Sequence, residues 1–176
     1  MAFIDLARER YSERRFASTP IEPEKLALIL EAGRVAPTAC NNQPQRILVV
    51  DTPAGLERID RCTKCRFGAP TVLVLAYDMT AAARNPDVVD FGVVDVSIVA
   101  THMMLQAAEL GIHSCWVGLI DPGELRRQFK APKTYRFVSV MPIGYPGPHS
   151  RPAGLHEASR PLDRLVFHES FAESER

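Results

Sequence analysis

The sequence lacks an excess of charge of either sign. Its 176 residues include 21 Lys and Arg and 21 Asp and Glu, so the formal net charge is zero. Proteins that bind nucleic acid usually concentrate positive charge, and we therefore expect no nucleic-acid partner. Apolar residues make up 46% of the chain, a composition typical of a soluble globular domain, which we expect to span residues 1–176 as one unit.

Targeting and membrane signals are also missing. The opening residues, MAFIDLARER, contain acidic side chains and no long apolar core, unlike a signal peptide. The chain has no run of about 18 apolar residues, so we expect no membrane span and a cytoplasmic location. In that compartment Cys40, Cys62, Cys65 and Cys115 are expected to be free thiols rather than disulfides.

The familiar catalytic signatures do not occur. There is no GxSxG elbow, Walker A loop, HExxH pair or GxGxxG turn, and the histidines have no metal-ligand spacing, so we expect no metal site. Cys62 and Cys65 form a lone CTKC, which is either a metal or redox pair or two incidental thiols. Without an evident acid–base pair, the sequence suits a protein whose reactive atoms belong to a cofactor.

Apolar patterning predicts alternating helices and strands, and hence a mixed α+β domain. Residues 85–87, Asn-Pro-Asp, are expected to form a turn. Helices are predicted over 23–34, 53–61, 88–110 and 122–129, and strands over 47–50, 71–78 and the segment that begins at Tyr135.

The predicted helix over 88–110 is apolar nearly all round, which indicates burial on most of its sides. One explanation is a central helix covered by its own domain. The other is a partner subunit that covers part of the helix, because a chain of this size has few places to bury every side of it. We favour the second and expect a homodimer.

Two polar segments could carry a binding site. In RERYSERRF, the residues Arg10, Ser12 and Arg14 alternate, and alternate residues of an extended chain point to one side. Two guanidinium groups and a hydroxyl there would fit a phosphate group; the alternative is a solvated surface balanced by Glu9 and Glu13. The second segment, APTACNNQPQR, is rich in amides and poor in charge, and it lies between a helix pattern and a strand pattern.

Four stretches in order resemble the FMN-dependent nitroreductase family in its short single-domain form. RYSERRF resembles the family's Arg-x-Ser-x-Arg phosphate motif, and APTACNNQPQR resembles its Pro-Ser-x-x-Asn-x-Gln-Pro flavin loop. DVSIVATHMMLQAAELGIHSCWVG is similar to its central helix and the Gly-x-x-x-x-Trp-x-Gly segment that follows. PIGYPG, with the later Arg160-Pro161-Leu162, resembles its C-terminal end, so the resemblance spans about Asp5 to Val166.

The resemblance implies an α+β sandwich with a mixed, mainly antiparallel sheet flanked by helices. It also implies that two chains pack through their long helices with each flavin at the interface, and that the C-terminal segment 149–176 crosses to the partner. Hydride would pass in a ping-pong reaction from NADH or NADPH to N5 of FMN, and then to an electron-poor acceptor such as a nitroaromatic or a quinone.

The resemblance assigns no catalytic side chain, because flavin N5 is the reactive centre. Neutral amides of the loop meet both the carbonyl acceptors and the N–H donor at the ring's pyrimidine edge. The cofactor-binding residues that it implies are Arg10, Tyr11, Ser12, Arg14 and Arg160 for the phosphate, Pro37, Thr38, Ala39, Asn41 and Gln43 for the ring, and the backbone of Cys115, Trp116, Val117 and Gly118 for its N5 edge.

Two residues depart from the family's pattern. Thr38 replaces the usual serine and keeps the hydroxyl, while Gln45 stands where an aromatic residue is frequent and leaves the pocket's rim more polar. The second departure bears on the substrate class. Other functions remain open: a flavin-storage or sensing module without turnover, a subunit with no flavin, or a family variant such as an iodotyrosine deiodinase or a benzimidazole synthase.

Overall fold

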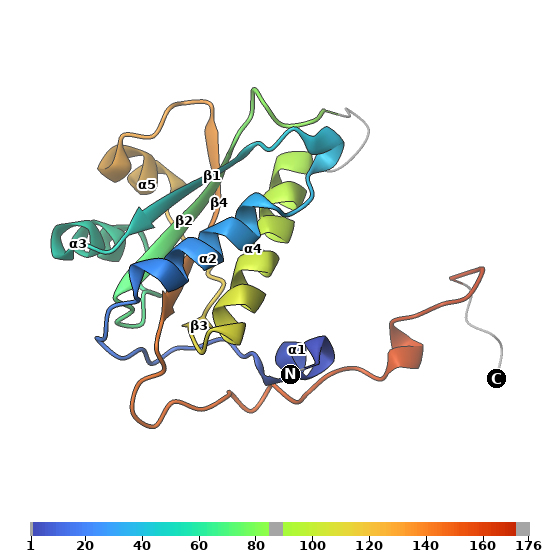
Figure 1. Cartoon of the computed structure of the whole chain (residues 1–176). Coiled ribbons are helices and arrows are strands. Elements are labelled where there is room, and N and C mark those ends of the chain that lie inside the picture. Colours follow the sequence, from blue (N-terminus) through green and yellow to red (C-terminus); the bar gives the residue numbers. More distant parts are fainter. Residues whose placement is uncertain (1, 85–89, 172–176) are drawn as a thin grey trace.

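A computed structural model describes residues 2–84 and 90–171 and shows a sheet between two layers of helices (Figure 1). The strands are β1 (Gln45–Val50), β2 (Thr71–Asp78), β3 (His113–Ser114) and β4 (Tyr135–Gly144). They lie in the order β1-β2-β4-β3, and each neighbouring pair is antiparallel. The expected α+β architecture is confirmed, with its parallel pairing limited, among the described residues, to an isolated bridge between Ser12 and Ser114.

Two pairs of helices cover the two faces of the sheet. One face carries α2 (Pro23–Arg34) and α4 (Phe91–Glu109), and the other carries α3 (Pro53–Cys62) and α5 (Pro122–Phe129) (Figure 1). The short helix α1 (Phe3–Glu9), which the sequence patterns did not predict, lies near the C-terminal end of α4. Two 3-10 turns complete the elements: η1 (Ala39–Asn41) and η2 (Leu162–Arg164).

Burial of strand β2 on both of its faces explains why its sequence is an unbroken apolar run. Leu73 and Leu75 face the core beneath α2 and α4. Val72 and Val74 face the second core beneath α3 and α5. Successive side chains of a strand point to opposite faces, so a strand that is covered on both sides needs apolar residues at every position.

Most of the predicted elements match the observed ones, with small shifts at their ends. Strand β1 begins two residues earlier than expected, and α3 ends at Cys62. The predicted turn at 85–87 and the expected start of the long helix at 88–89 lie outside the described residues; the described helix α4 begins at Phe91. Gly33 lies inside α2, where a Cβ would stand 2.9 Å from Met103.

Helix α4 presents one face to its own domain and another to the outside. Val99 and Met103 are fully buried, whereas Val93 and Val94 are about two-fifths exposed. The outer face forms an open groove of about 400 Å³, lined by Val93, Val94, Ser97, Ile98, Thr101 and His102. The helix is therefore not buried all round within one chain.

Helix α4 is also long and apolar enough to cross a bilayer by length and composition. Core helices of globular domains meet the same criterion, and α4 contributes five buried apolar residues to the core that it shares with α2 and the sheet. That packing explains the apolar residues on the inner face of α4 without a membrane.

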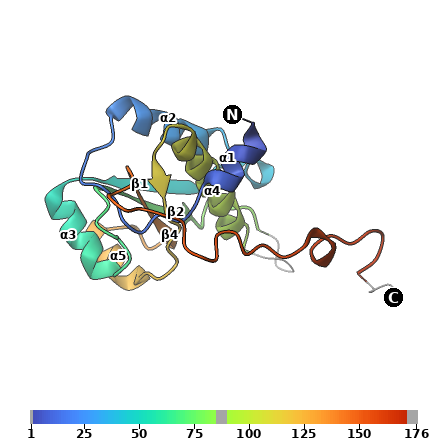
Figure 2. The ribbon, with the colours of Figure 1, turned by 90° about the horizontal axis from the view of Figure 1, so that it is seen from below.

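The C-terminal tail leaves the body of the domain. After β4 the chain passes near α1, and both Figure 1 and Figure 2 show the segment around η2 running away from the sheet and the helices. The tail carries large apolar side chains that are mostly exposed: Leu155, Leu162, Leu165, Val166, Phe167 and Phe171. Such a row of uncovered apolar groups on an extended segment is typical of a surface that another chain covers.

The N-terminus of α4 is fixed by a tyrosine beneath it. The Tyr77 hydroxyl donates a hydrogen bond to Asp90, and Asp90 Oδ1 accepts one from the amide of Gly92 at 3.0 Å. Burial of the phenol, together with its bond to Asp90, raises the pKa of Tyr77 to about 12. A Cβ on Gly92 would overlap the Tyr77 ring, so this helix start requires glycine.

We predict that Gly92→Ala lowers the free energy of unfolding by about 1–3 kcal/mol, because overpacking displaces side chains and backbone. Urea unfolding measures the change. The matched control is Gly123→Ala: Gly123 is likewise the second residue of its helix, and its added Cβ would meet only Asp121 Oδ1, at 3.3 Å. We expect the control to change stability by less than about 1 kcal/mol. Equal losses in the two variants would contradict the role given to Tyr77.

Candidate flavin-binding site

The arginine segment, residues 10–16, runs as an extended strand along the edge of the sheet. It begins where α1 ends, and Ser12 forms its parallel bridge to Ser114 of β3. The amide of Glu13 donates to the carbonyl of Ser114 at 3.0 Å. On the other side, the carbonyl of Arg15 accepts from the amide of Gly147 at 2.7 Å. The segment is therefore held between β3 and the chain that follows β4.

The predicted phosphate residues of this segment fall into two groups, Ser12 with Arg14 and Arg10 with Tyr11. Arg14 is exposed, and its Nη1 donates to the carbonyl of Ser12 at 3.3 Å. Arg10 and Tyr11 are half-buried and line a cavity of about 290 Å³. The cavity's other lining residues come from α1, from the end of α4 and from its junction with β3: Leu6, Glu9, Ala108, Glu109, Ile112 and His113.

The alternative interpretation of the segment was a solvated surface on which Glu13 helps to balance the arginines. Glu13 does not have that role, because it is buried. Its side chain is 2% exposed, and its Oε1 accepts hydrogen bonds from the amides of Arg14 and Arg15, each at 2.8 Å. Its Oε2 accepts from the hydroxyl of Ser150. Burial alone would raise the pKa of this carboxyl, but the hydrogen bonds from Ser150 and from the two amides outweigh burial and lower the pKa below the usual 4.5.

Aromatic and imidazole rings surround this carboxylate. Tyr11 shares a hydrogen bond of 2.8 Å with Ser150, and its ring stands edge-on to His113 at 4.9 Å between centroids. His113 Nδ1 lies 3.3 Å from Glu13 Oε2, but without the alignment of a hydrogen bond. His156, further along the tail, is the second ring beside Tyr11, at 6.0 Å. The cluster ties the arginine segment to the start of the C-terminal tail.

The segment Cys115–Gly118 runs along β4, and its pairing with β4 limits the number of backbone groups that are free to bind a ligand. The amide of Cys115 donates to Pro142, and Val117 exchanges both of its hydrogen bonds with Val140. These groups are not available to a ring, in contrast to the expectation that all four residues would offer backbone groups. Trp116 and Gly118 alternate with them, and among the described residues neither of their N–H groups donates a backbone hydrogen bond, while the Gly118 carbonyl accepts from the amide of Ile120 at 3.0 Å. A Cβ on Gly118 would meet nothing within 4 Å, so space is open beside it.

Cys115 is not an activated nucleophile. It is 3% exposed, and burial raises the pKa of its thiol. Burial likewise raises the pKa of Cys62 to about 11, and the Cys62 Sγ donates to the carbonyl of Arg58 at 3.2 Å. Both thiols therefore stay protonated near neutral pH, which suits packing rather than reactivity.

The amide loop, residues 37–44, has an unusual backbone. Cys40, Asn41 and Gln43 have φ angles of 53°, 54° and 49°, in the left-handed region. Such a conformation costs on the order of 1–3 kcal/mol for each residue and persists where the surroundings enforce it. Thr38 Oγ1 accepts from the amide of Gln43 at 3.0 Å, and this bond closes the loop upon itself. Cys40, Asn41 and Gln43 are exposed, while Thr38 and Ala39 are half-buried.

Asp95 supports this loop from helix α4, a role that the sequence patterns missed. The N-cap of α4 is Asp90. Asp95 is instead 1% exposed, and its Oδ1 accepts from the amide of Ala39 at 2.8 Å. A carboxylate inside an otherwise apolar helix could have signalled such a buried partner, since acidic residues are almost never fully buried unless they are paired.

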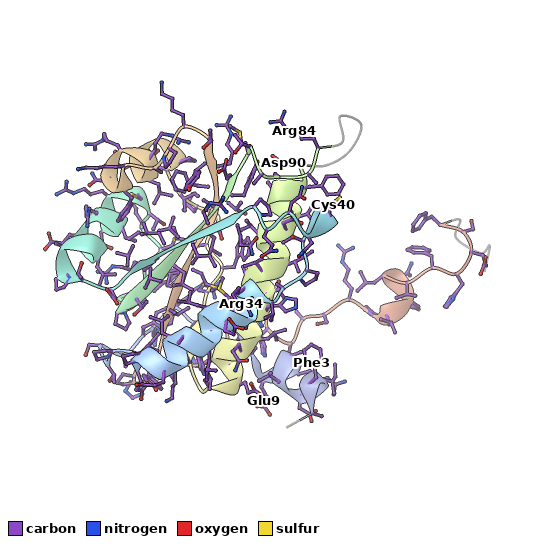
Figure 3. All side chains as sticks on the ribbon, turned by 45° about the horizontal axis from the view of Figure 1, so that its top comes forward. Phe3, Glu9, Arg34, Cys40, Arg84 and Asp90 are labelled. Atoms are coloured by element: carbon purple, nitrogen blue, oxygen red, sulfur yellow. The ribbon has the colours of Figure 1, made fainter. Side chains whose placement is uncertain are left out.

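The arginine segment and the amide loop lie at opposite ends of α4. Figure 3 places Cys40 beside Asp90 at one end of the helix and Glu9 at the other. Helix α4 has 19 residues, which corresponds to a length of about 28 Å. Within one chain, the structure therefore brings the phosphate residues close to the segment Cys115–Gly118, because Ser12 pairs with Ser114, but it does not bring either of them to Thr38, Ala39 and Asn41.

Arg160 is separate from both groups in the single chain. It is exposed on the tail just before η2, and among the described residues its side chain makes no hydrogen bond or ion pair. Pro37 precedes the amide loop's turn and is exposed as well. Arg160 could join a phosphate site only where the tail meets another surface.

Comparisons with known proteins agree with this geometry. The nitroreductase family's sequence model matches residues 7–67 and 60–145, which together cover most of the chain. The chain belongs to the nitroreductase family. Its membership makes it an oxidoreductase by class and accounts for the fold described above.

Individual relatives of this nitroreductase match it over most of their lengths. A crystal structure of a nitroreductase family protein from Clostridium difficile 630 has 32% identity and a TM-score of 0.91, covering 97% of this chain and 100% of that one. An FMN-dependent nitroreductase from C. difficile R20291 has 26% identity and a TM-score of 0.78 over 96% and 99%. A Streptomyces coelicolor protein, named as a candidate NADH dehydrogenase/NAD(P)H nitroreductase, is 30% identical over 80% of this chain and 79% of its own.

The residues present in this nitroreductase fit an FMN molecule in two parts. Two guanidinium groups and the Ser12 hydroxyl suit a phosphate group, because planar N–H forks match its oxygens. The loop's neutral amides suit a ring edge that has both donors and acceptors. The open space beside Gly118 suits the approach of a flat ring.

We predict that Glu13→Gln lowers the free energy of unfolding at pH 7 by about 1–3 kcal/mol, because a buried hydrogen-bonded charge is lost. The folded-state pKa of Glu13 is depressed, so its contribution is fully present above the unfolded pKa of about 4.3 and is lost as the pH falls through the lower folded value. Urea unfolding between pH 3 and pH 7 should show the two proteins converging in acid. The exposed Glu57→Gln serves as control, and a wild-type advantage that grows in acid would contradict the assignment.

Proposed function

We propose that this protein is an FMN-dependent NAD(P)H oxidoreductase that reduces an electron-poor acceptor such as a nitroaromatic or a quinone. The observation that carries the proposal is the pair of half-sites: a phosphate-binding half formed by Arg10, Ser12 and Arg14, and a ring-binding half formed by Thr38 to Gln43. Both halves have the chemistry of FMN's two ends, and the family match includes them. The names of two relatives mention NAD(P)H and FMN, which supports NAD(P)H as the electron donor and FMN as the cofactor.

The two half-sites call for a second chain. A short ribityl chain joins the ring and the phosphate of FMN, whereas the two half-sites of one chain meet α4 at Asp95 and at Ala108, 13 residues apart, which corresponds to about 20 Å along the helix. A two-fold pairing of antiparallel α4 helices would bring the arginine segment of one chain to the amide loop of the other. The apolar outer face of α4, with Val94 and Ile98, is the surface available for that pairing.

In such a dimer, the chain's own groups would bind and orient the cofactor. Arg10, Arg14 and Ser12 would hold the phosphate, and Arg160 would join them from the tail. The loop would hydrogen-bond the ring's edge, and the open space at Gly118 would admit the ring. When bound, FMN supplies the two-electron carrier that none of these side chains provides. Gln45, at the start of β1, leaves a polar rim that admits acceptors with oxygen substituents.

We predict that the purified protein releases FMN on heating, close to one molecule per chain, and that it oxidises NADH or NADPH only when a quinone or nitroaromatic is added. Chromatography of the released flavin and absorbance at the reduced-nicotinamide band measure the two results. FAD, or no flavin even after reconstitution, would overturn the cofactor assignment. FMN at full occupancy without turnover of any donor would leave a flavin-storage module as the function.

A second prediction tests the shared site by complementation. Arg10→Glu repels the phosphate, and Asn41→Trp places a bulky ring where the flavin edge would lie; each homodimer should bind FMN at least tenfold more weakly, since a charge-assisted bond contributes about 1.5–3 kcal/mol. A heterodimer that carries one variant in each chain, isolated with two affinity tags, should regain one wild-type site. The reason is that the intact arginine segment of one chain meets the intact loop of the other.

The control for this experiment is Arg84→Glu, an exposed arginine on the loop after β2 (Figure 3). It should leave the affinity for FMN unchanged in every combination. A site built within one chain would give no recovery in the heterodimer, because each of its chains would carry one damaged half. Ile98→Glu, on the outer face of α4, should abolish dimer and FMN binding together in sedimentation; Met103→Glu cannot report on the dimer, because Met103 is fully buried within its own chain.

A further inference from the structure

Asp95 is a buried carboxylate whose position packing does not explain. It is the fifth residue of α4 and is 1% exposed. Its Oδ1 accepts the Ala39 amide at 2.8 Å, while its Oδ2 is buried and has no hydrogen-bond partner among the described residues. Burying a charged group with an unpaired oxygen is unfavourable compared with an apolar side chain of the same size. A specific task for the carboxylate would account for its presence.

The contact of Asp95 ties the earlier half of the amide loop to another element. The later half is held by Arg46, whose Nη1 donates to the carbonyls of Gln43, Pro44 and Gln45 at 2.9–3.3 Å. The earlier half contains the turn with Cys40 and Asn41 in the left-handed region. Ala39 is the first residue of that turn.

The tie from Asp95 also joins two elements that are 56 residues apart in sequence. It fixes the turn to a helix that is anchored in the main core. The bond therefore sets both the conformation of the loop and its place relative to α4, so that the exposed side chains beyond Ala39 face outward from a rigid base.

We propose that Asp95 is a positioning residue for the flavin-ring loop. By holding the Ala39 amide, it directs Thr38, Ala39 and Asn41 toward the isoalloxazine ring, and it acts on the ring through the loop rather than by touching it. The flavin-binding part of this inference rests on the proposed function; the tie between Asp95 and the conformation of the loop does not.

Three variants of the full chain test this role. Asp95→Val keeps a similar shape and removes the acceptor, whereas Asp95→Asn keeps a side-chain carbonyl that can accept from Ala39. Val99→Ala, one turn further along α4, is the matched control, because it opens a cavity at a fully buried position without touching the loop. Each variant is compared with the wild type in thermal unfolding, in amide hydrogen exchange over residues 37–44, and in dissociation constants for FMN and for riboflavin.

For Asp95→Val we expect exchange at Ala39 to be at least about tenfold faster in the flavin-free protein, because a charge-assisted bond is lost. FMN and riboflavin should both bind about tenfold more weakly and by a similar factor, since the loop acts on the ring that both ligands share. The melting temperature should fall no more than in Val99→Ala, because an unpaired buried oxygen is removed as well. Asp95→Asn should stay within about threefold of the wild type in both affinities.

Other results would overturn the proposal. Unchanged exchange at Ala39 in Asp95→Val would show that the bond does not hold the loop. Equal weakening of flavin binding in Val99→Ala would show that general destabilisation is the cause, and loss of FMN affinity with riboflavin affinity unchanged would move the effect to the phosphate half. If the wild type binds neither flavin, the proposed function fails, and the exchange measurement still decides whether Asp95 holds the loop.

Discussion

The length of helix α4 is the constraint on which the rest of this structure depends. A helix is rigid over its 19 residues, and it is fixed at its start by Tyr77 and Asp90 and along one side by α2. The amide loop is tied near one end of it and the arginine segment lies beside the other. Neither segment can move along the helix, and this is why the flavin site that we propose takes its two halves from two chains.

The uncovered parts of the chain are consistent with that constraint. The outer face of α4 has apolar side chains in an open groove, and the tail carries exposed leucines and phenylalanines on an extended segment. Both features cost hydrophobic stabilisation in an isolated chain. Both features fit the dimer that we propose, in which the partner that covers α4 would also supply the missing half of the flavin site.

The sequence predicted those parts of the fold that depend on local chemistry. Strand β2 could be predicted because both of its faces are buried and its sequence is therefore apolar throughout. Helix α5 could be predicted because Asp121 and Pro122 mark its start. Helix α1 could not be predicted from the sequence, because it has only seven residues, none of them fully buried, and so lacks a periodic pattern of apolar residues. The burial of Glu13 was also hidden, since the direction of one side chain in a charged run is set by β3 and by Ser150, 137 residues away.

Each half-site is organised by a buried carboxylate that accepts backbone amides. Glu13 takes the amides of Arg14 and Arg15, and Asp95 takes the amide of Ala39. A carboxylate can accept several hydrogen bonds at once, so it can fix a segment that lacks regular secondary structure, where amides would otherwise be left unpaired. Arginines and neutral amides at the surface carry the chemistry of the ligand that we propose. The two acids beneath them determine where those groups are held, which is why the surface motifs can be read from the sequence and their supports require the structure.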